Sequence, residues 1–225
     1  MALLGKAVLA MWWDVSAEAR PELEHWHAHE HFPERLALPG FRRASRWTAV
    51  DGGDGFFVMY ELEDHAVLAS APYVARLNAP SPWSTRMMPL HRGMVRTQCQ
   101  VLDSRGAFTA RHALTIRLSP ADADALRHGL GTLAETVVQQ PGLVGLHLLR
   151  HQAPALAATT EQRIRGHADR AADWVVVACG YDLDALRRLE GAELGATALC
   201  TLGAVAGGER RFYTLAYAAV PSDVH

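Results

Sequence analysis

The sequence predicts an α+β fold in which two tandem ferredoxin-like β-α-β-β-α-β repeats pack their antiparallel sheets against one another. Three observations support this fold. The same order of apolar strands and amphipathic helices occurs twice along the 225 residues. The first helix of each repeat ends at a Pro-Gly pair, Pro39-Gly40 and Pro141-Gly142. A sheet with both helices on one face must bury its other face, and the sheet of the other repeat is the obvious cover.

The first repeat, residues 1–105, is predicted from the spacing of its apolar residues. Its predicted elements are a strand at 6–15, a helix at 18–38, strands at 41–50 and 56–63, a helix to about 77, and a strand at 93–102. Pro21 is tolerated in the first turn of the first helix, and Asp64 can cap the second. The glycine-rich stretch 51–55 is predicted to be a hairpin turn with positive φ rather than a phosphate loop.

The second repeat, residues 106–225, follows the same order. Its predicted elements are a strand at 112–118, a helix from Ser119 as cap to about 140, strands at 143–150 and 174–181, a helix at 182–194, and a strand at 211–220. The stretch 152–173 is rich in Ala, Thr and Arg and is longer than a hairpin needs, as in a lid or a disordered insertion.

Composition narrows the class of protein. The chain is 49% apolar, and its 22 basic residues nearly balance 24 acidic ones, so neither a nucleic acid nor a membrane is expected as a partner. The apolar segment 3–13 is too short to span a bilayer and is predicted to be a strand, which favours a cytoplasmic protein. Cys99, Cys179 and Cys200 show no CxxC spacing and are predicted to be buried free thiols.

Four histidines lie close together in the first predicted helix, at positions 25, 27, 29 and 31. Helical periodicity divides them into two pairs. The stripe that faces the sheet consists of Leu23, Trp26, His27, Glu30 and His31. His25 and His29 point away from it. Histidine can take or give a proton near neutral pH, so the inward pair are candidates for acid-base chemistry.

Alignment of the two repeats by their Pro-Gly pairs favours a functional role for this helix. His27 and His31 then correspond to Gly129 and Leu133, so the fold itself does not need histidine there. We therefore predict His31 as a catalytic acid or base, with Glu30 and His27 as its catalytic partners. Glu30 could fix the tautomer of His31 or accept its proton. The alternative is that His31 is a structural residue whose ring nitrogens are hydrogen-bonded within the fold.

A metal site would use His27 and His31, which are one helical turn apart as in HExxH proteins. Two ligands are too few, and nothing in the spacing demands a third. The main prediction is therefore that no metal is bound. The sequence also has no Gly-x-Ser-x-Gly elbow for a serine nucleophile.

Further residues are predicted to bind a substrate in the cleft between this helix layer and its sheet. They are Trp26, Arg46, Tyr60, Trp83, Met87 and Arg92. A cleft lined by Trp, Tyr and Met with a few polar groups suits an apolar small molecule. Arg92 and Arg96 could hold a carboxylate or an enolate, although a solvated strand edge explains Arg96 as well.

A family resemblance follows from these residues. The segment Trp26…Glu30-His31-Phe32-Pro33-Glu34-Arg35-Leu36…Pro39-Gly40-Phe41, continued by Tyr60-Glu61-Leu62, Tyr73 and Pro82-Trp83, resembles the EthD-like branch of the dimeric α/β-barrel superfamily. The resemblance covers residues 5–102 best. It implies that the two tandem sheets form one intramolecular α/β barrel. It also implies a site between sheet and helices, as in relatives that include cofactor-free monooxygenases, lactone isomerases, polyketide cyclases and haem enzymes. The Glu-His-x-Pro signature implies a role for His31 but not for the other three histidines.

These observations favour a small-molecule enzyme without an organic cofactor. His31 would act as acid or base on an apolar aromatic or polyketide-like substrate, in an isomerase, cyclase, lyase or monooxygenase. One alternative is a haem enzyme, or an enzyme with a divalent metal on His27 and His31. Another is a non-catalytic ligand-binding protein, and a homodimer is left open.

Overall fold

The computed structural model describes residues 3–53, 55–166 and 169–224. The described residues form a closed barrel of eight strands in the order β1-β3-β2-β8-β5-β7-β6-β4. The strands are β1 (Ala7–Asp14), β2 (Phe41–Ala49), β3 (Gly55–Leu62), β4 (Arg92–Gly106), β5 (His112–Leu118), β6 (Leu143–His151), β7 (Trp174–Gly180) and β8 (Glu209–Ala219). Asp54 of the predicted hairpin turn lies outside the described residues.

Two four-stranded sheets make up the barrel. Within each repeat the strands adopt the antiparallel order of a ferredoxin-like sheet, β4-β1-β3-β2 and β8-β5-β7-β6. The edge strands then pair between repeats, β2 with β8 and β4 with β6. Each repeat therefore closes the open edges of the other, which confirms the predicted tandem α/β barrel.

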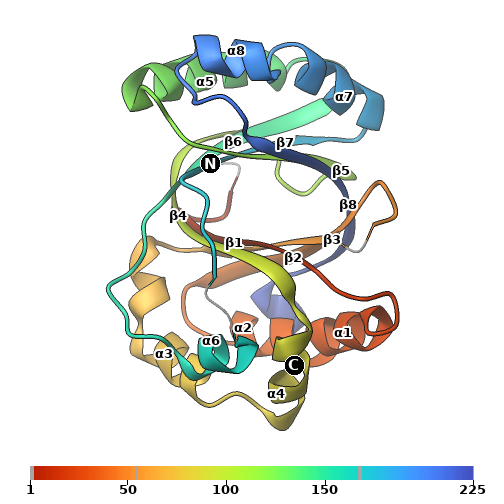
Figure 1. Cartoon of the computed structure of the whole chain (residues 1–225), viewed down its shortest axis with the longest axis vertical. Coiled ribbons are helices and arrows are strands. Elements are labelled where there is room, and N and C mark those ends of the chain that lie inside the picture. Colours follow the sequence, from red (N-terminus) through yellow and green to blue (C-terminus); the bar gives the residue numbers. More distant parts are fainter. Residues whose placement is uncertain (1–2, 54, 167–168, 225) are drawn as a thin grey trace.

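Helices cover the outer face of each sheet (Figure 1). The first repeat has α1 (Arg20–Trp26), a π-helical turn (His27–His31), α2 (Phe32–Leu36), a 3₁₀ turn (His65–Ala69), α3 (Ala71–Asn78), α4 (Pro82–Met87) and a 3₁₀ turn (Met88–Leu90). The second repeat has α5 (Ala123–Val137), α6 (Thr160–Arg165), α7 (Leu183–Gly191), α8 (Ala196–Thr201) and a 3₁₀ turn (Pro221–Asp223). None of the helices among the described residues has the length and apolar character needed to cross a bilayer.

The hydrophobic core has three layers. One lies between the first sheet and its helices, with Leu23, Phe32 and Tyr60. A second fills the barrel interior with side chains such as Trp12, Trp47 and Phe57. The third lies between the second sheet and α5, α7 and α8. The barrel is packed inside, so a ligand site must be sought between a sheet and its helices.

Two of the predicted helices differ from the structure, the first because of a proline and the second because of its cap. The helix after Asp64 is interrupted at Ser70, because Pro72 has no N–H for the helical bond and its ring clashes with the preceding turn. The helix predicted from Ser119 begins later, since Asp122 is its cap and accepts a bond from Ala125 N–H at 3.0 Å. The hydroxyl of Ser119 instead donates to the carboxylate of Asp173.

One other expectation is corrected. Cys99 and Cys179 are buried free thiols, but Cys200 is exposed because it lies on the outer side of α8. For the stretch 152–173 the sequence left open a lid or a disordered insertion, and its described part contains α6, which packs against α3 and the turn Met88–Leu90 (Figure 1). The division of the chain at residue 105 stays a prediction.

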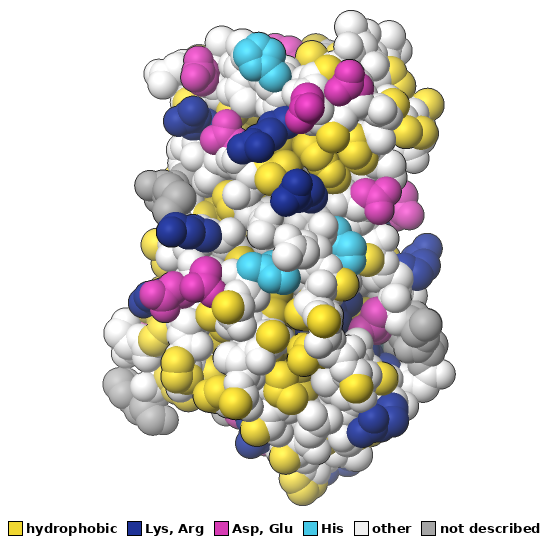
Figure 2. All heavy atoms as spheres, turned by 90° about the vertical axis from the view of Figure 1, so that its left-hand side faces the viewer, with side chains coloured by type: hydrophobic (Ala, Val, Ile, Leu, Met, Phe, Trp, Pro, Cys, Tyr) yellow, Lys and Arg dark blue, Asp and Glu magenta, His cyan; other side chains and the backbone are white. Residues whose placement is uncertain are grey.

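Basic and acidic side chains are interspersed over the face that Figure 2 shows. This agrees with the near balance of charges in the sequence.

Candidate functional site

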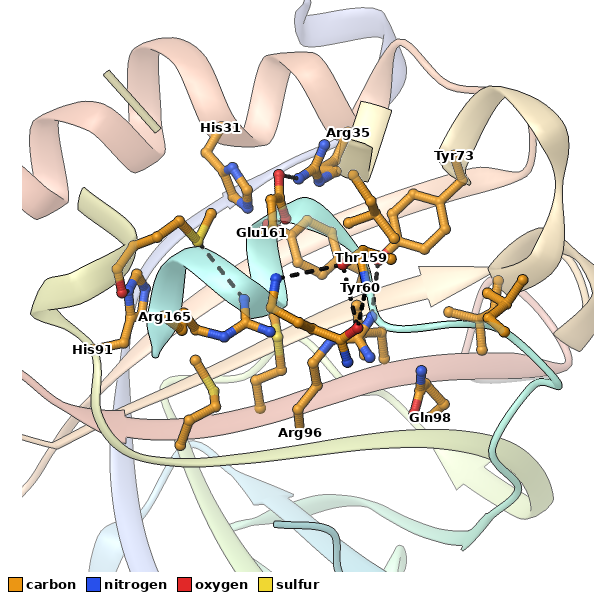
Figure 3. Close-up of a pocket in the computed structure, with 18 of the residues that line it drawn as sticks. His31, Arg35, Tyr60, Tyr73, His91, Arg96, Gln98, Thr159, Glu161 and Arg165 are labelled. Carbon is orange, nitrogen blue, oxygen red and sulfur yellow. Dashed lines mark hydrogen bonds and ion pairs between the residues drawn. The ribbon is translucent and has the colours of Figure 1, made fainter. Parts of the chain in front are cut away.

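A cavity of about 200 Å³ lies between the first sheet and its helices. Strands β1, β3 and β4 supply one side of it, and the helical segment 26–35 with α3 supplies the other. Its apolar lining consists of Leu9, Met11, Trp13, Trp26, Leu68, Leu77, Met88, Met94 and Leu156. Residues of the stretch 153–165, including α6, complete the wall (Figure 3). The cavity is therefore built by one repeat and covered by the other.

The π-helical turn presents the two inward histidines to this cavity. Phe32 N–H bonds to the carbonyl of His27, five residues back, instead of to that of Ala28. Pro33 explains the widening, because it has no N–H for the carbonyl of His29 and its ring would clash there in a regular α-helix. As a result the rings of His27 and His31 stack at 5.5 Å between centroids. Single π turns of this kind are frequent at functional sites.

Both histidines are buried, and each has a ring nitrogen that makes no hydrogen bond to a described residue. Nδ1 of each lacks a hydrogen-bond partner among the described residues. Burial, followed by the charge of Arg46, lowers the pKa of His27 well below its usual 6.5. Burial, followed by the charge of Arg35, lowers the pKa of His31 well below 6.5 as well. Both imidazoles are consequently neutral at pH 7 and can accept a proton or a hydrogen bond.

Arg35 brings a permanent positive charge to the same wall, one turn beyond His31. Its Nη2 donates to Glu161 Oε1 at 2.5 Å, and both side chains are buried. Burial alone would disfavour the guanidinium charge, but Glu161 outweighs this and raises the pKa of Arg35. Its Nη1 has no partner among the residues described. Arg35 therefore has one donor committed to α6 and one available to a ligand.

A phenol and a third imidazole complete the polar lining near His31. The hydroxyl of Tyr60, on β3, is buried without a partner in the described chain. Burial raises the pKa of Tyr60 well above 10, so the phenol stays protonated at neutral pH. His91 lines the cavity too, and burial lowers its pKa to about 4. Its Nδ1–H donates to the carbonyl of Met88 at 3.0 Å.

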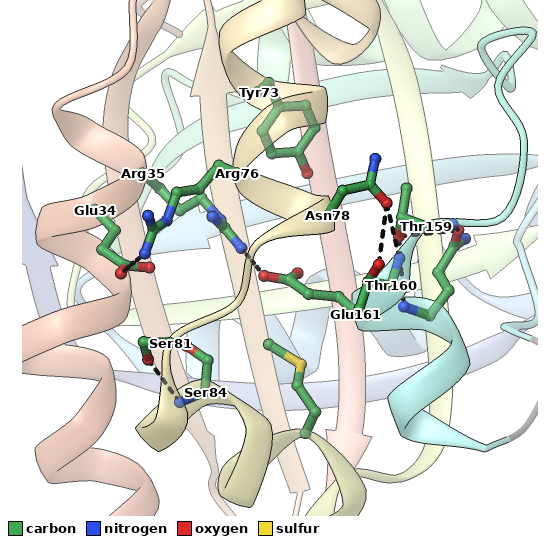
Figure 4. Close-up of polar contacts among 12 residues, drawn as sticks. Glu34, Arg35, Tyr73, Arg76, Asn78, Ser81, Ser84, Thr159, Thr160 and Glu161 are labelled. Carbon is green, nitrogen blue, oxygen red and sulfur yellow. Dashed lines mark hydrogen bonds and ion pairs between the residues drawn. The ribbon is translucent and has the colours of Figure 1, made fainter.

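Helix α6 is fastened to the first repeat by three polar contacts. Glu161 pairs with Arg35 of α2. Thr160 N–H donates to Asn78 Oδ1 of α3 at 3.0 Å (Figure 4). Arg165 lies 3.7 Å from the Met88 sulfur and pairs with Asp169 at 2.7 Å. This segment therefore acts as a lid on the cavity.

Four of the predicted site residues line the cavity, namely Trp26, His27, His31 and Tyr60. The others lie elsewhere. Glu30 accepts hydrogen bonds from Trp26 Nε1 at 3.0 Å, Ser81 Oγ at 2.5 Å and Ser84 Oγ at 3.2 Å. Its carboxylate thus connects the first helix to α4 and does not meet His31, so the structure does not bring the predicted Glu30–His31 pair together.

The remaining predicted substrate-binding residues are also outside the lining. Arg46 Nη1 donates to the carbonyl of Glu24 at 2.9 Å, and Arg46 is not among the lining residues. Trp83 packs against exposed His25 at 5.3 Å between ring centroids. Met87 is buried in the core of the first layer, and Arg92 is exposed at the start of β4. Their predicted roles have no support from the cavity geometry.

Several lining residues were not among the predicted site residues. Arg35 lies four residues after His31, on the same helix stripe, and that spacing was a usable signal. The lid residues Glu161 and Arg165 could not be found in this way, because the contact between the 152–173 stretch and the first repeat is purely tertiary.

A metal ion has no suitable ligand set here. Among the described residues, no group of three or more His, Cys, Asp or Glu side chains is arranged to hold one. The stacked rings of His27 and His31 supply at most two nitrogen ligands, and a stable site generally needs three or four. The residues present therefore do not fit the predicted metal alternative.

Comparison with known proteins supports the fold. No family model matches the sequence, and no curated protein sequence matches it. A protein from Fusobacterium nucleatum described as a "putative monooxygenase" superposes with a TM-score of 0.62 at 8% identity, covering 97% of this chain and 96% of its own. An anthrone oxidase-like protein gives 0.62 at 11% identity, with 95% and 92% coverage. A "putative monooxygenase" from Lactobacillus acidophilus gives 0.59 at 9% identity, with 96% and 97% coverage.

These similarities span nearly the whole chain and define the protein as a tandem ferredoxin-like α/β barrel. At such low identity they show the fold and not the reaction. Membership of the EthD-like branch stays a prediction.

Proposed function

We propose that this protein is a small-molecule enzyme that removes a proton from an apolar, enolisable aromatic substrate held in the cavity under α6. The observation that carries the proposal is that several buried polar groups without partners among the described residues line one cavity. Three of them are Nδ1 of His31, Nη1 of Arg35 and the hydroxyl of Tyr60, and Nδ1 of His27 and Nε1 of Trp13 belong to the same set. Polar atoms that are buried without partners cost stability, so their retention together favours a ligand that satisfies them.

Each group has a distinct chemical role in this proposal. His31 is neutral at pH 7 and accepts the proton as general base. The negative charge that develops on the substrate oxygen accepts hydrogen bonds from Arg35 and from the Tyr60 phenol, whose raised pKa keeps it a donor. The apolar lining and the α6 lid exclude water, which strengthens both interactions.

The structural neighbours agree with a small-molecule enzyme of this kind. Two of them are described as monooxygenases and one as anthrone oxidase-like. Deprotonation of an enolisable ring is a shared first step for isomerase, cyclase and monooxygenase chemistry, so the proposal stops at that step.

The haem alternative is less consistent with the cavity. A volume of about 200 Å³ lies below the roughly 300–1,000 Å³ that is usual for drug-sized ligands. A macrocycle would require α6 to leave its place and the Arg35–Glu161 pair to break. No step of the proposed chemistry is assigned to haem or to a metal.

Proton exchange tests the proposal without knowledge of the final product. Anthrone and smaller aromatic ketones are incubated with the protein in D₂O, and loss of the carbon-bound proton is followed by NMR. We expect the wild type to accelerate exchange of at least one compound. His31→Gln should lower that rate by about 100-fold or more, since general base catalysis contributes on this scale.

His29→Gln is the matched control, because His29 is exposed and lies on the same helical turn. It should leave the exchange rate unchanged. An equal rate in wild type and His31→Gln contradicts the proposal. Binding of these compounds without any accelerated exchange would identify a ligand-binding protein instead.

A further inference from the structure

One arginine in the cavity lining has no acidic partner among the described residues. Arg96, on β4, is only 9% exposed and donates from Nη2 to the Tyr73 hydroxyl at 3.1 Å. Within the described ranges, no carboxylate lies at ion-pair distance from its guanidinium. The other two arginines of the lining do have such partners, Arg35 with Glu161 at 2.5 Å and Arg165 with Asp169 at 2.7 Å.

The neighbouring groups do not offset the charge of Arg96. The three histidines of the lining have pKa values below the usual 6.5 and are neutral at pH 7, so they add no charge of either sign. Glu161 is the one carboxylate among the described lining residues, and it is committed to Arg35. A buried cation without a counter-ion is costly, which leaves the cavity with one uncompensated positive charge.

We infer that the ligand of this cavity is an aromatic carboxylate whose carboxyl group pairs with Arg96. This inference rests on the proposed function for the reacting end of the ligand, which lies under His31. The carboxylate end lies toward β4, where Tyr73, Gln98 and Thr159 line the same part of the cavity as Arg96 (Figure 3). The ligand therefore spans the cavity with its ring against the apolar lining.

A carboxylate fits this place better than a larger oxyanion. The planar guanidinium fork matches two carboxylate oxygens in its plane. The Arg35–Glu161 pair already shows that a buried guanidinium and a carboxylate fit side by side in this layer. The cavity of about 200 Å³ also limits the ligand to a small ring system.

Calorimetric titration with matched probes tests the inference. The probes are benzoate, its neutral isostere benzamide, phenyl phosphate and inorganic phosphate. Wild-type protein should bind benzoate at least about 10-fold more tightly than benzamide, and more tightly than either phosphate probe, since charge-assisted hydrogen bonds are worth about that factor.

Arg96→Met keeps much of the apolar stem and removes the charge. We expect it to weaken benzoate binding by about 10- to 100-fold and to leave benzamide binding unchanged. Arg105→Met is the matched control, because Arg105 is an exposed arginine on the same strand outside the cavity lining. It should bind all four probes as the wild type does.

Arg96→Lys covers the case in which Arg96→Met does not fold. It retains the charge but replaces the planar fork by a point charge, so the preference for benzoate over benzamide should fall while staying above one. An equal affinity for benzoate and benzamide in wild type overturns the inference. So does a benzoate affinity that is unchanged in the Arg96 variants, or tighter binding of a phosphate probe.

These outcomes are separable from those of the proposed function. Binding is measured in the absence of turnover, so it can be repeated in His31→Gln. If the protein prefers benzoate but His31→Gln retains full proton exchange, the carboxylate site is supported and the catalytic role of His31 is contradicted. If the protein shows no preference for benzoate but proton exchange depends on His31, the catalytic role is supported and the carboxylate site is contradicted.

Discussion

The two helix layers of this barrel have the same architecture and different contents. In the first layer, His27, His31 and Arg35 line a cavity. Their counterparts in α5, aligned by the Pro-Gly pairs, are Gly129, Leu133 and Val137, and that layer is filled by leucine, valine and alanine side chains. A filled layer satisfies the fold, so the hollow and its polar groups in the first repeat are an addition that the fold did not require.

The two repeats also differ in the connection that follows their second strand. In the first repeat the chain passes from β2 to β3 through a short hairpin. In the second, the connection from β6 to β7 is the stretch that contains α6 and reaches across to the first repeat (Figure 1). The second repeat thus supplies the lid for the cavity of the first repeat.

Exchanging the equivalent residues Arg35 and Val137 should produce the largest effects on stability. Val137 is fully buried, so Val137→Arg places a charge without a partner in a filled layer. We expect a loss of about 3–5 kcal/mol in the free energy of unfolding. Arg35→Met should cost a similar amount, because it leaves Glu161 buried without its cation. Urea titration measures both.

The double variant Arg35→Met/Glu161→Met separates charge from packing. Replacing both members of a buried ion pair by apolar residues is often nearly neutral, so most of the lost stability should return. If the double variant is as unstable as Arg35→Met, the unpaired charge of Glu161 is not the cause of the instability of the single variant.

Acid should destabilise the protein through its buried histidines. The pKa of His91 is about 4 in the folded chain and about 6.5 in the unfolded one. The unfolded state therefore takes up more protons between these values, and the free energy of unfolding falls as the pH drops from 6.5 to 4. The contribution of His91 is about 3 kcal/mol, since each pKa unit corresponds to about 1.4 kcal/mol.

Urea titrations at pH 7, 6, 5 and 4 measure this fall. His91→Gln should remove the part that belongs to His91. His128→Gln should leave the slope as it is, because His128 is an exposed residue of α5 in the second repeat. Identical slopes in wild type and His91→Gln would contradict the assignment.

Truncating one buried leucine in each helix layer should give the smallest difference. Leu130 is buried in the filled second layer, and Leu130→Ala should cost about 2–5 kcal/mol. Leu77 already faces the cavity of the first layer, so Leu77→Ala removes fewer contacts and should cost less, about 1–2 kcal/mol. Equal costs would indicate that the first layer is as well packed as the second.

Local pattern predicted the elements well where neighbouring residues decide the structure. The strands and the two first helices follow from apolar periodicity, and the Pro-Gly stops end those helices as expected. Prolines caused two differences in the first repeat. Pro33 converts a helical turn to a π turn, and Pro72 interrupts the next helix, both through effects on the preceding carbonyl groups that periodicity does not register.

The lining of the cavity was predicted only as far as one helix and one strand. His27, His31, Trp26 and Tyr60 share faces that periodicity identifies, and all four line the cavity. Glu30 shares the stripe as well, but Ser81 and Ser84 hold its carboxylate. Their contact with Glu30 depends on how α4 packs against the first helix, and no spacing in the sequence expresses that.

The sequence by itself determined the duplication, the strand order within each repeat and the placing of polar residues on the inward face of one helix. These depend on local periodicity, turn residues and the need to bury one face of a sheet. Only the tertiary structure decided that α6 covers the cavity, that Glu161 pairs with Arg35 and that Arg96 is buried with no acidic partner in the described part of the chain. Such features depend on contacts between segments that are distant in the sequence. These contacts bury charged groups, and a buried charge is costly unless an opposite charge lies beside it.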